Sequence, residues 1–172
     1  MRSRSDGLPV RPGGAWTMEK LAYVEQSAAA FTRAMKGKWG RLVYIDLLAG
    51  PGRGVRRDTG EEFDGSPIRA LKVNPLFDHL FLGDLGRKTV NALEKRIPPR
   101  DAGRVTLLCG DCNELATRVA AQLTGRTLGL AFVGPAGFGP RSTCSGPSPP
   151  GRLTFSSSFP IRSGSCETWL AS

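Results

Sequence analysis

The sequence predicts an α/β fold built on a doubly wound parallel sheet. Four short, nearly continuous apolar runs indicate strands buried on both faces, at residues 42–48, 79–84, 105–111 and 128–134. Helix-like segments separate these runs, at residues 66–73, 87–97 and 113–123. Strands that alternate with helices favour parallel pairing through right-handed crossovers. We therefore expect a Rossmann-like sheet, left incomplete at four strands.

A further helix is expected before the first strand. Thr17 is a candidate cap for its start, and Gly37 is a candidate for its end. Between them, apolar residues recur at steps of three and four: Leu21, Val24, Ala28, Phe31 and Met35. This spacing predicts an amphipathic helix with one face packed on the sheet.

Three stretches fit neither the strand period nor the helix period. Residues 1–14 are rich in Arg, Ser, Gly and Pro, and we expect a mobile leader there. The polar residues 53–65 are expected to form a long surface loop. Residues 139–172 are rich in Ser, Gly and Pro, which indicates a low-complexity, irregular tail. A chain of 172 residues has room for one ordinary domain, and residues 15–138 are expected to form it.

Composition narrows the cellular context and the partners. No apolar run is long enough to span a membrane, and the N-terminus lacks the apolar segment of a secretory signal, so we expect a cytoplasmic protein without a membrane partner. The net charge is +9, which makes nucleic acid a possible partner. The basic excess is spread along the chain, however, and this gives a dedicated nucleic-acid surface only weak support.

The cysteines do not form a complete metal-binding pattern. Cys109 and Cys112 have the spacing of a redox or metal pair. A second cysteine pair of this spacing is missing, and the chain has one histidine, His79. We therefore expect no metal site.

Acidic residues end the first three predicted strands. Asp46 is followed by the loop AGPGRG, in which Gly50 and Gly52 allow a ligand to approach the backbone closely. Asp84 ends the second strand, where a carboxylate commonly accepts hydrogen bonds from both ribose hydroxyls. Asp111 follows the third strand and could accept from an exocyclic amine. Because the carboxyl ends of parallel strands share one edge, the pattern predicts an adenosine-bearing ligand.

Two ligands of this kind compete. A nicotinamide dinucleotide requires a glycine loop that opens directly into a helix, whose N-terminus holds the pyrophosphate. Here Arg53, Gly54 and the polar stretch to residue 65 follow instead. S-adenosylmethionine has no pyrophosphate, so the sequence favours it as the cofactor.

Seven short motifs follow one another along the chain: WTMEKL (16–21), KGKW (36–39), YIDLLAGPGR (44–53), DGSPIRAL (64–71), FLGD (81–84), CGDCN (109–113) and AFVGPAGF (131–138). In this series the chain resembles the three-Cys-motif partner proteins (TcmP), which look like class I S-adenosylmethionine-dependent methyltransferases. The resemblance implies a cofactor loop of Asp46, Ala49, Gly50, Pro51 and Gly52. It implies that Asp84 holds the ribose and that Asp111 and Cys112 lie near the adenine. It also implies a protein partner with a three-cysteine motif, and it leaves the methyl acceptor open.

The chain departs from the family pattern in two places. The resemblance implies an acid after the fourth strand, facing the transferred methyl group, and Gly134 stands there. The pattern also implies further helices and strands where residues 139–172 are irregular. The coding sequence of the tail can also be read in the frame that joins the third base of each codon to the first two bases of the next codon. In that frame it can encode one segment with the helix period and one apolar run typical of a buried strand. A frameshift near residues 138–141 is therefore a hypothesis for the tail.

Three functions remain open from the sequence. The first is an S-adenosylmethionine-dependent methyltransferase domain of the TcmP type, inactive in this chain because of Gly134. The second is a non-catalytic module that binds the cofactor and contacts a partner. The third is an NAD(P)-dependent oxidoreductase.

Overall fold

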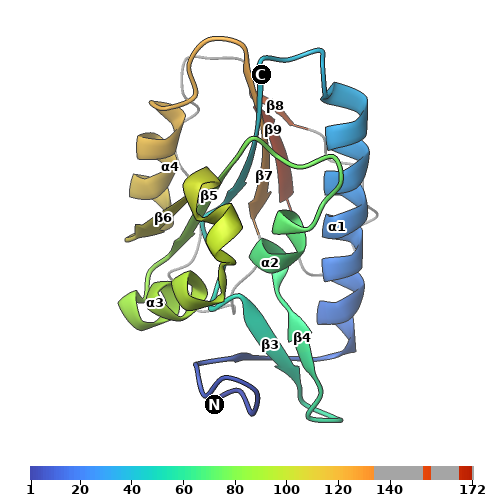
Figure 1. Cartoon of the computed structure of the whole chain (residues 1–172), viewed down its shortest axis with the longest axis vertical. Helices are drawn as coiled ribbons and strands as arrows, with labels where there is room; N and C mark the ends of the chain where they lie inside the picture. Colours follow the sequence, from blue (N-terminus) through green and yellow to red (C-terminus); the bar gives the residue numbers. More distant parts are fainter. Residues whose placement is uncertain (134–152, 156–166, 172) are drawn as a thin grey trace.

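The computed structural model describes residues 1–133, 153–155 and 167–171. Gly134 and the rest of the tail lie outside the described residues, so the predictions made for them stay predictions. A six-stranded sheet in the order β6-β5-β2-β7-β9-β8 forms the centre of the molecule (Figure 1). A second sheet has three strands in the order β1-β3-β4.

Four neighbouring strands of the central sheet are parallel. They are β2 (Arg41–Asp46), β5 (His79–Asp84), β6 (Val105–Cys109) and β7 (Thr127–Val133). Their order β6-β5-β2-β7 places the strand order reversal between β2 and β7, as in a Rossmann-like fold. The predicted α/β fold with four parallel strands is confirmed, and each strand lies within two residues of its predicted bounds at either end.

Helices cover both faces of this sheet. On one face lie α1 (Ala15–Met35), α2 (Ser66–Leu71) and α3 (Arg87–Arg96), and on the other lies α4 (Cys112–Ala120). A 3-10 helix, η1 (Pro99–Arg104), follows α3. The predicted cap at Thr17 is wrong, because Gly14 is the N-cap residue and the backbone N–H of Thr17 donates to the Gly14 carbonyl.

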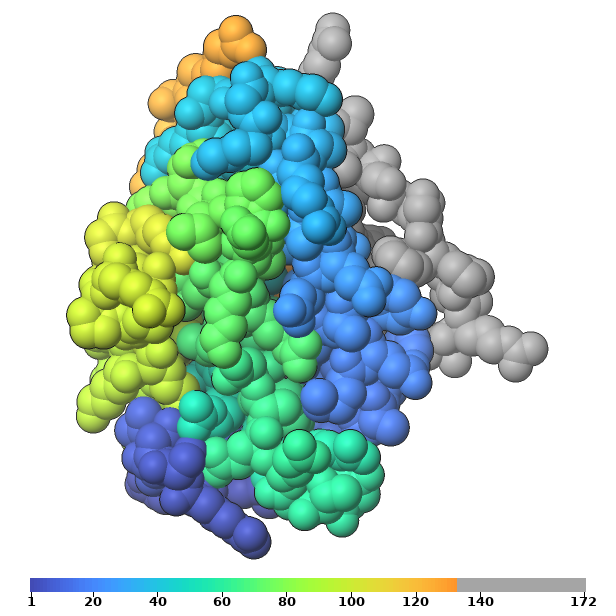
Figure 2. Space-filling view, turned by 45° about the vertical axis from the view of Figure 1, so that its right-hand side comes forward, coloured from blue at the N-terminus to red at the C-terminus, as the bar shows by residue number. Residues whose placement is uncertain are grey.

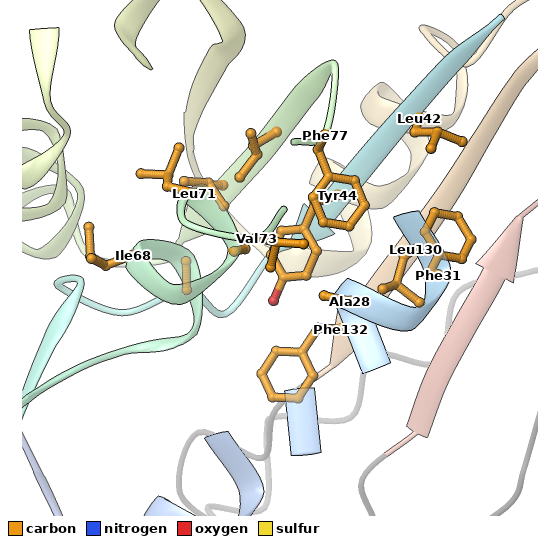
Figure 3. Packing of buried hydrophobic residues seen from close by; sticks show 14 of the residues in the cluster. Ala28, Phe31, Leu42, Tyr44, Ile68, Leu71, Val73, Phe77, Leu130 and Phe132 are labelled. Atoms are coloured by element: carbon orange, nitrogen blue, oxygen red, sulfur yellow. The ribbon is translucent and has the colours of Figure 1, made fainter. Parts of the chain in front are cut away.

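Alternate residues of β2 supply the core on its two faces. Leu42 and Tyr44 pack with α1 and α2, whereas Val43 and Ile45 pack with residues of α4. The Tyr44 ring lies 5.4 Å from that of Phe77, between centroids, and both side chains are fully buried (Figure 3). Burial of each large apolar side chain contributes about 1.5–3 kcal/mol, so this cluster fixes α1 and α2 on the sheet.

The stretch expected as a surface loop contains a hairpin instead. Strands β3 (Arg53–Arg56) and β4 (Glu62–Asp64) pair antiparallel, and Gly60 adopts a positive φ of 72° in the turn between them. Strands of three or four residues are too short to show an alternating pattern, which is why the sequence did not indicate them.

Residues 1–14, expected to be a mobile leader, lie against this hairpin. Strand β1 (Arg11–Gly13) pairs parallel with β3, and Ser3 and Val10 are buried. The segment lies at the carboxyl edge of the central sheet, below it in Figure 1.

Two strands of the central sheet come from the segment that the sequence predicted as an irregular tail. Strand β9 (Glu167–Ala171) pairs antiparallel with β7, and β8 (Leu153–Phe155) pairs antiparallel with β9. Strand β7 is therefore an interior strand in the structure, and the sheet extends past the four predicted strands. Within the described part of the chain, no helix is both long and apolar enough to cross a membrane.

Candidate functional site

Asp46 and Asp84 end neighbouring parallel strands, as the sequence predicted. Register pairs Asp46 of β2 with Leu82 of β5, so both carboxylates lie at the carboxyl edge of the sheet. The loop after β2 is held to β5 by a hydrogen bond of 2.8 Å from the Ala49 N–H to the Gly83 carbonyl. The predicted loop is therefore in direct contact with the end of β5.

Asp84 accepts hydrogen bonds on both carboxylate oxygens. The Gly50 N–H donates to Oδ2 at 3.1 Å, and the Gly86 N–H donates to Oδ1 at 3.0 Å. Arg11 of β1 also reaches Oδ2, with its Nη2 at 3.3 Å. The residue is 8% exposed, so these protein groups surround most of the carboxylate.

Asp46 is fully buried and faces α2. The Ser66 hydroxyl donates to Oδ2 at 2.6 Å, and the Leu48 N–H donates to Oδ1 at 3.2 Å. Burial raises the pKa of Asp46 from 3.8 to about 6, although the hydrogen bonds from Ser66 and Leu48 oppose this rise. Arg11 and Lys20 are near enough for their charges to lower this pKa as well. Asp46 therefore anchors the loop from within rather than offering a free carboxylate.

The two glycines of the predicted cofactor loop have different constraints. Gly50 and Gly52 both adopt positive φ angles, 68° and 82°. A Cβ on Gly52 would lie 2.8 Å from Leu93 Cδ1, so this position packs against α3. A Cβ on Gly50 would instead meet the Arg11 guanidinium, at 3.2 Å from Cζ. Gly50 thus allows another group to come close to the backbone, and in this structure that group is the Arg11 guanidinium.

The other two predicted loop residues, Ala49 and Pro51, are buried. Arg96 Nη1 of α3 donates to the Pro51 carbonyl at 2.6 Å. The loop is therefore held from β5 at Ala49 and from α3 at Pro51.

Asp111 has a capping role in the structure. It is the N-cap of α4, where its Oδ1 accepts the Asn113 N–H at 2.9 Å, and its side chain is exposed. Cys112 begins α4 and is half-buried. The Gly110 N–H donates to the Asp84 carbonyl at 3.2 Å, which brings this turn next to the end of β5. Among the described residues, no hydrogen bond or ion pair joins Asp111 to Asp46 or Asp84.

Sequence reasoning missed two residues of the site. Arg11 belongs to a segment that had no periodic pattern, and no signal in the sequence pointed to it. Ser66 was inside the quoted motif DGSPIRAL but was not assigned a role, although a hydroxyl at the start of a helix is a common polar contact. In the part of the chain that the structure describes, no three His, Cys, Asp or Glu side chains gather as a metal site would require.

The strand-end acids are not among the residues that line two of the cavities in the described part of the chain. One of about 400 Å³ lies beside the N-terminal segment, and its lining includes Asp6, Arg53 and Arg96. The other, of about 530 Å³, lies between α2 and η1. Asp46 and Asp84 are both buried, and the Arg11 side chain lies against Asp84.

No family model matches the sequence, and no curated protein matches it. A solved structure with a similar backbone is that of protein LPL1258 from Legionella pneumophila str. Philadelphia 1, described with the family model DUF519. The two chains are 13% identical and superimpose with a TM-score of 0.43. The match covers 63% of this chain and 66% of that one, just under two thirds, and at this score it carries no argument about function.

Proposed function

We propose that this chain binds S-adenosylmethionine at the carboxyl edge of its sheet, as a methyltransferase-like domain similar to TcmP. The methyl acceptor is unassigned. Because Gly134 stands where the resemblance implies an acid, we expect cofactor binding without methyl transfer by this chain. A protein with a three-cysteine motif is the partner that the resemblance suggests.

The position of Asp84 supports the proposal. It lies at the end of the strand next to β2, and it accepts the Gly50 N–H of the glycine loop, where the Arg11 side chain lies against the backbone. A carboxylate offers about four lone-pair sites, so one that already accepts from Gly50 and Gly86 can still accept from ribose hydroxyls. The fit is incomplete at the adenine end, because Asp111 is engaged as a helix cap.

The same loop makes a dinucleotide the weaker candidate. After Gly52 the chain continues into β3, and α2 begins only at Ser66. The glycine loop therefore has no helix N-terminus directly after it to hold a pyrophosphate.

Calorimetric titration of the purified chain with S-adenosylmethionine tests the proposal, with reduced nicotinamide dinucleotide as the competing ligand. We expect Asp84→Ala to weaken S-adenosylmethionine binding by roughly 1.5–3 kcal/mol for each ribose hydrogen bond lost. Asp84→Asn should also weaken it while keeping one acceptor for the backbone donors. The matched control is Asp58→Asn, an exposed carboxylate in the β3–β4 turn. Equal affinity of all variants would remove Asp84 from the site.

A further inference from the structure

The ligand-facing side of Asp84 is occupied by a side chain from the N-terminal segment. Arg11 Nη2 lies 3.3 Å from Asp84 Oδ2, the same oxygen that accepts the Gly50 N–H. The guanidinium also lies over Gly50, since a Cβ built there would be 3.2 Å from Arg11 Cζ and 3.3 Å from Nη1. Arg11 therefore fills the two positions that make the proposed site suitable for a ligand: the acceptor and the space above the loop.

The segment that carries Arg11 is fastened to the rest of the molecule. Arg96 of α3 donates to both carboxylate oxygens of Asp6, at 2.8 and 2.9 Å, and to the Pro9 carbonyl at 2.8 Å. The Arg96 side chain is only 5% exposed, whereas that of Asp6 is 27% exposed, so the contact lies at the surface with its arginine buried. On the other side, Glu62 of β4 accepts from the hydroxyls of Ser3 and Ser5.

These contacts hold the segment across the edge of the sheet. In Figure 2 the N-terminal residues lie at the base of the molecule, against the residues that follow β5 and beside the β3–β4 hairpin. Parallel pairing of β1 with β3 fixes Arg11 opposite Gly54. The guanidinium is thus delivered to Asp84 by a backbone that is anchored before and after it.

We propose that residues 1–13 form an autoinhibitory strap, in which Arg11 pairs with Asp84 and must leave before a ribose can bind there. This inference rests on the proposed function. The ion pair between Arg11 and Asp84 is weak, since the Arg11 side chain is 46% exposed and reaches the carboxylate with one nitrogen at 3.3 Å. Exposed ion pairs contribute little, so release of Arg11 is within reach of a ligand or a partner.

Titration of the full chain and of Arg11→Met with S-adenosylmethionine tests the strap. Methionine keeps an apolar stem and removes the guanidinium, so we expect affinity to rise roughly two- to fivefold, the range that a partly exposed ion pair allows. Asp6→Asn, which weakens the anchor to Arg96, should change affinity in the same direction. Arg57→Met is the matched control. Arg57 is exposed on the β3–β4 hairpin, and none of the ion pairs among the described residues involves it.

Two further measurements separate the strap from other roles of Arg11. We expect amide exchange of residues 1–13 to become faster when ligand binds, and unchanged exchange would contradict the strap. Titration with 5′-methylthioadenosine, which lacks the amino-acid carboxylate, should show the same gain in Arg11→Met. If Arg11→Met weakens S-adenosylmethionine but not methylthioadenosine, Arg11 is a ligand-binding residue and the strap is wrong.

The two proposals fail in different ways. If the parent chain and Arg11→Met bind with equal affinity, the strap is wrong and the proposed function stands. If neither variant binds any adenosyl ligand, the proposed function fails and the strap falls with it.

Discussion

Asp46 shows how one buried residue sets a property that can be measured without a ligand. The carboxyl group is fully buried at the end of β2, with Ser66 and Leu48 as hydrogen-bond donors. Two donors do not replace the hydration that a carboxylate loses, so its pKa rises from 3.8 to about 6. The folded protein therefore holds this proton to a higher pH than the unfolded chain does.

The sign of the pH dependence follows from the raised pKa. Between about pH 4 and pH 6 the folded state binds more protons at Asp46 than the unfolded state, so stability falls as pH rises through this window. The full effect is about 3 kcal/mol, because each tenfold difference in proton affinity between the two states corresponds to about 1.4 kcal/mol. We expect the free energy of unfolding of Asp46→Asn to decrease less between pH 4 and pH 7 than that of the parent chain. Urea unfolding of both proteins over this pH range measures the difference.

Two other acids have lowered pKa values and therefore the opposite pH dependence. Hydrogen bonds lower the pKa of Asp58 and of Glu62 to about 2, and their contribution to stability is lost as pH falls toward that value. The difference between the parent chain and Asp46→Asn therefore isolates the buried group. Parallel stability curves for the two proteins would show that Asp46 titrates normally.

At the scale of elements, the small sheet β1-β3-β4 depends on the absence of a side chain at Gly54. A Cβ there would lie 2.3 Å from Phe63 Cζ and 3.0 Å from the Arg11 carbonyl oxygen. The third glycine of AGPGRG thus allows close packing between β1, β3 and β4.

Gly54→Ala should loosen this sheet. Phe63 must move, and overpacking of this kind typically costs about 1–3 kcal/mol, measured as a lower free energy of unfolding in urea. We expect Phe63→Leu to recover part of that loss in the double variant, because it removes the ring atoms that clash. The control is Gly103→Ala, at a position with open space around the added methyl group. Additive losses in the double variant would contradict the packing account.

The elements divide into those that the sequence could predict and those that it could not. Nearly continuous apolar runs such as residues 79–84 predicted strands correctly, because burial on both faces demands a continuous apolar sequence. Asp46 and Asp84 were placed correctly at one edge, because parallel strands bring their carboxyl ends together. β1 was missed, because three residues carry no period and its contacts come from distant parts of the chain.

At the scale of the whole molecule, the sheet differs from the prediction on one side. The sequence predicted four strands followed by an irregular tail, and such a sheet would leave the apolar strand at residues 128–134 as an exposed edge. In the structure β9 pairs with β7 over five residues, from Gly129 opposite Ala171 to Val133 opposite Glu167. The frameshift hypothesis for the tail stays a prediction, and resequencing of the gene past the codons for 138–141 tests it.

A proline in β9 distinguishes β7 as an interior strand, as in the structure, from β7 as an edge strand, as the sequence predicted. Leu170 lies between Leu130 of β7 and Thr154 of β8, and proline lacks the N–H that an interior strand needs. If β9 covers β7, Leu170→Pro should release it and leave an unpaired strand, which promotes association between chains. We then expect faster exchange at the alternate amides of β7 that face β9, while those facing β2 stay protected, and a larger species in sedimentation. If exchange over residues 127–133 is the same in both proteins, β7 is the sheet edge that the sequence predicted.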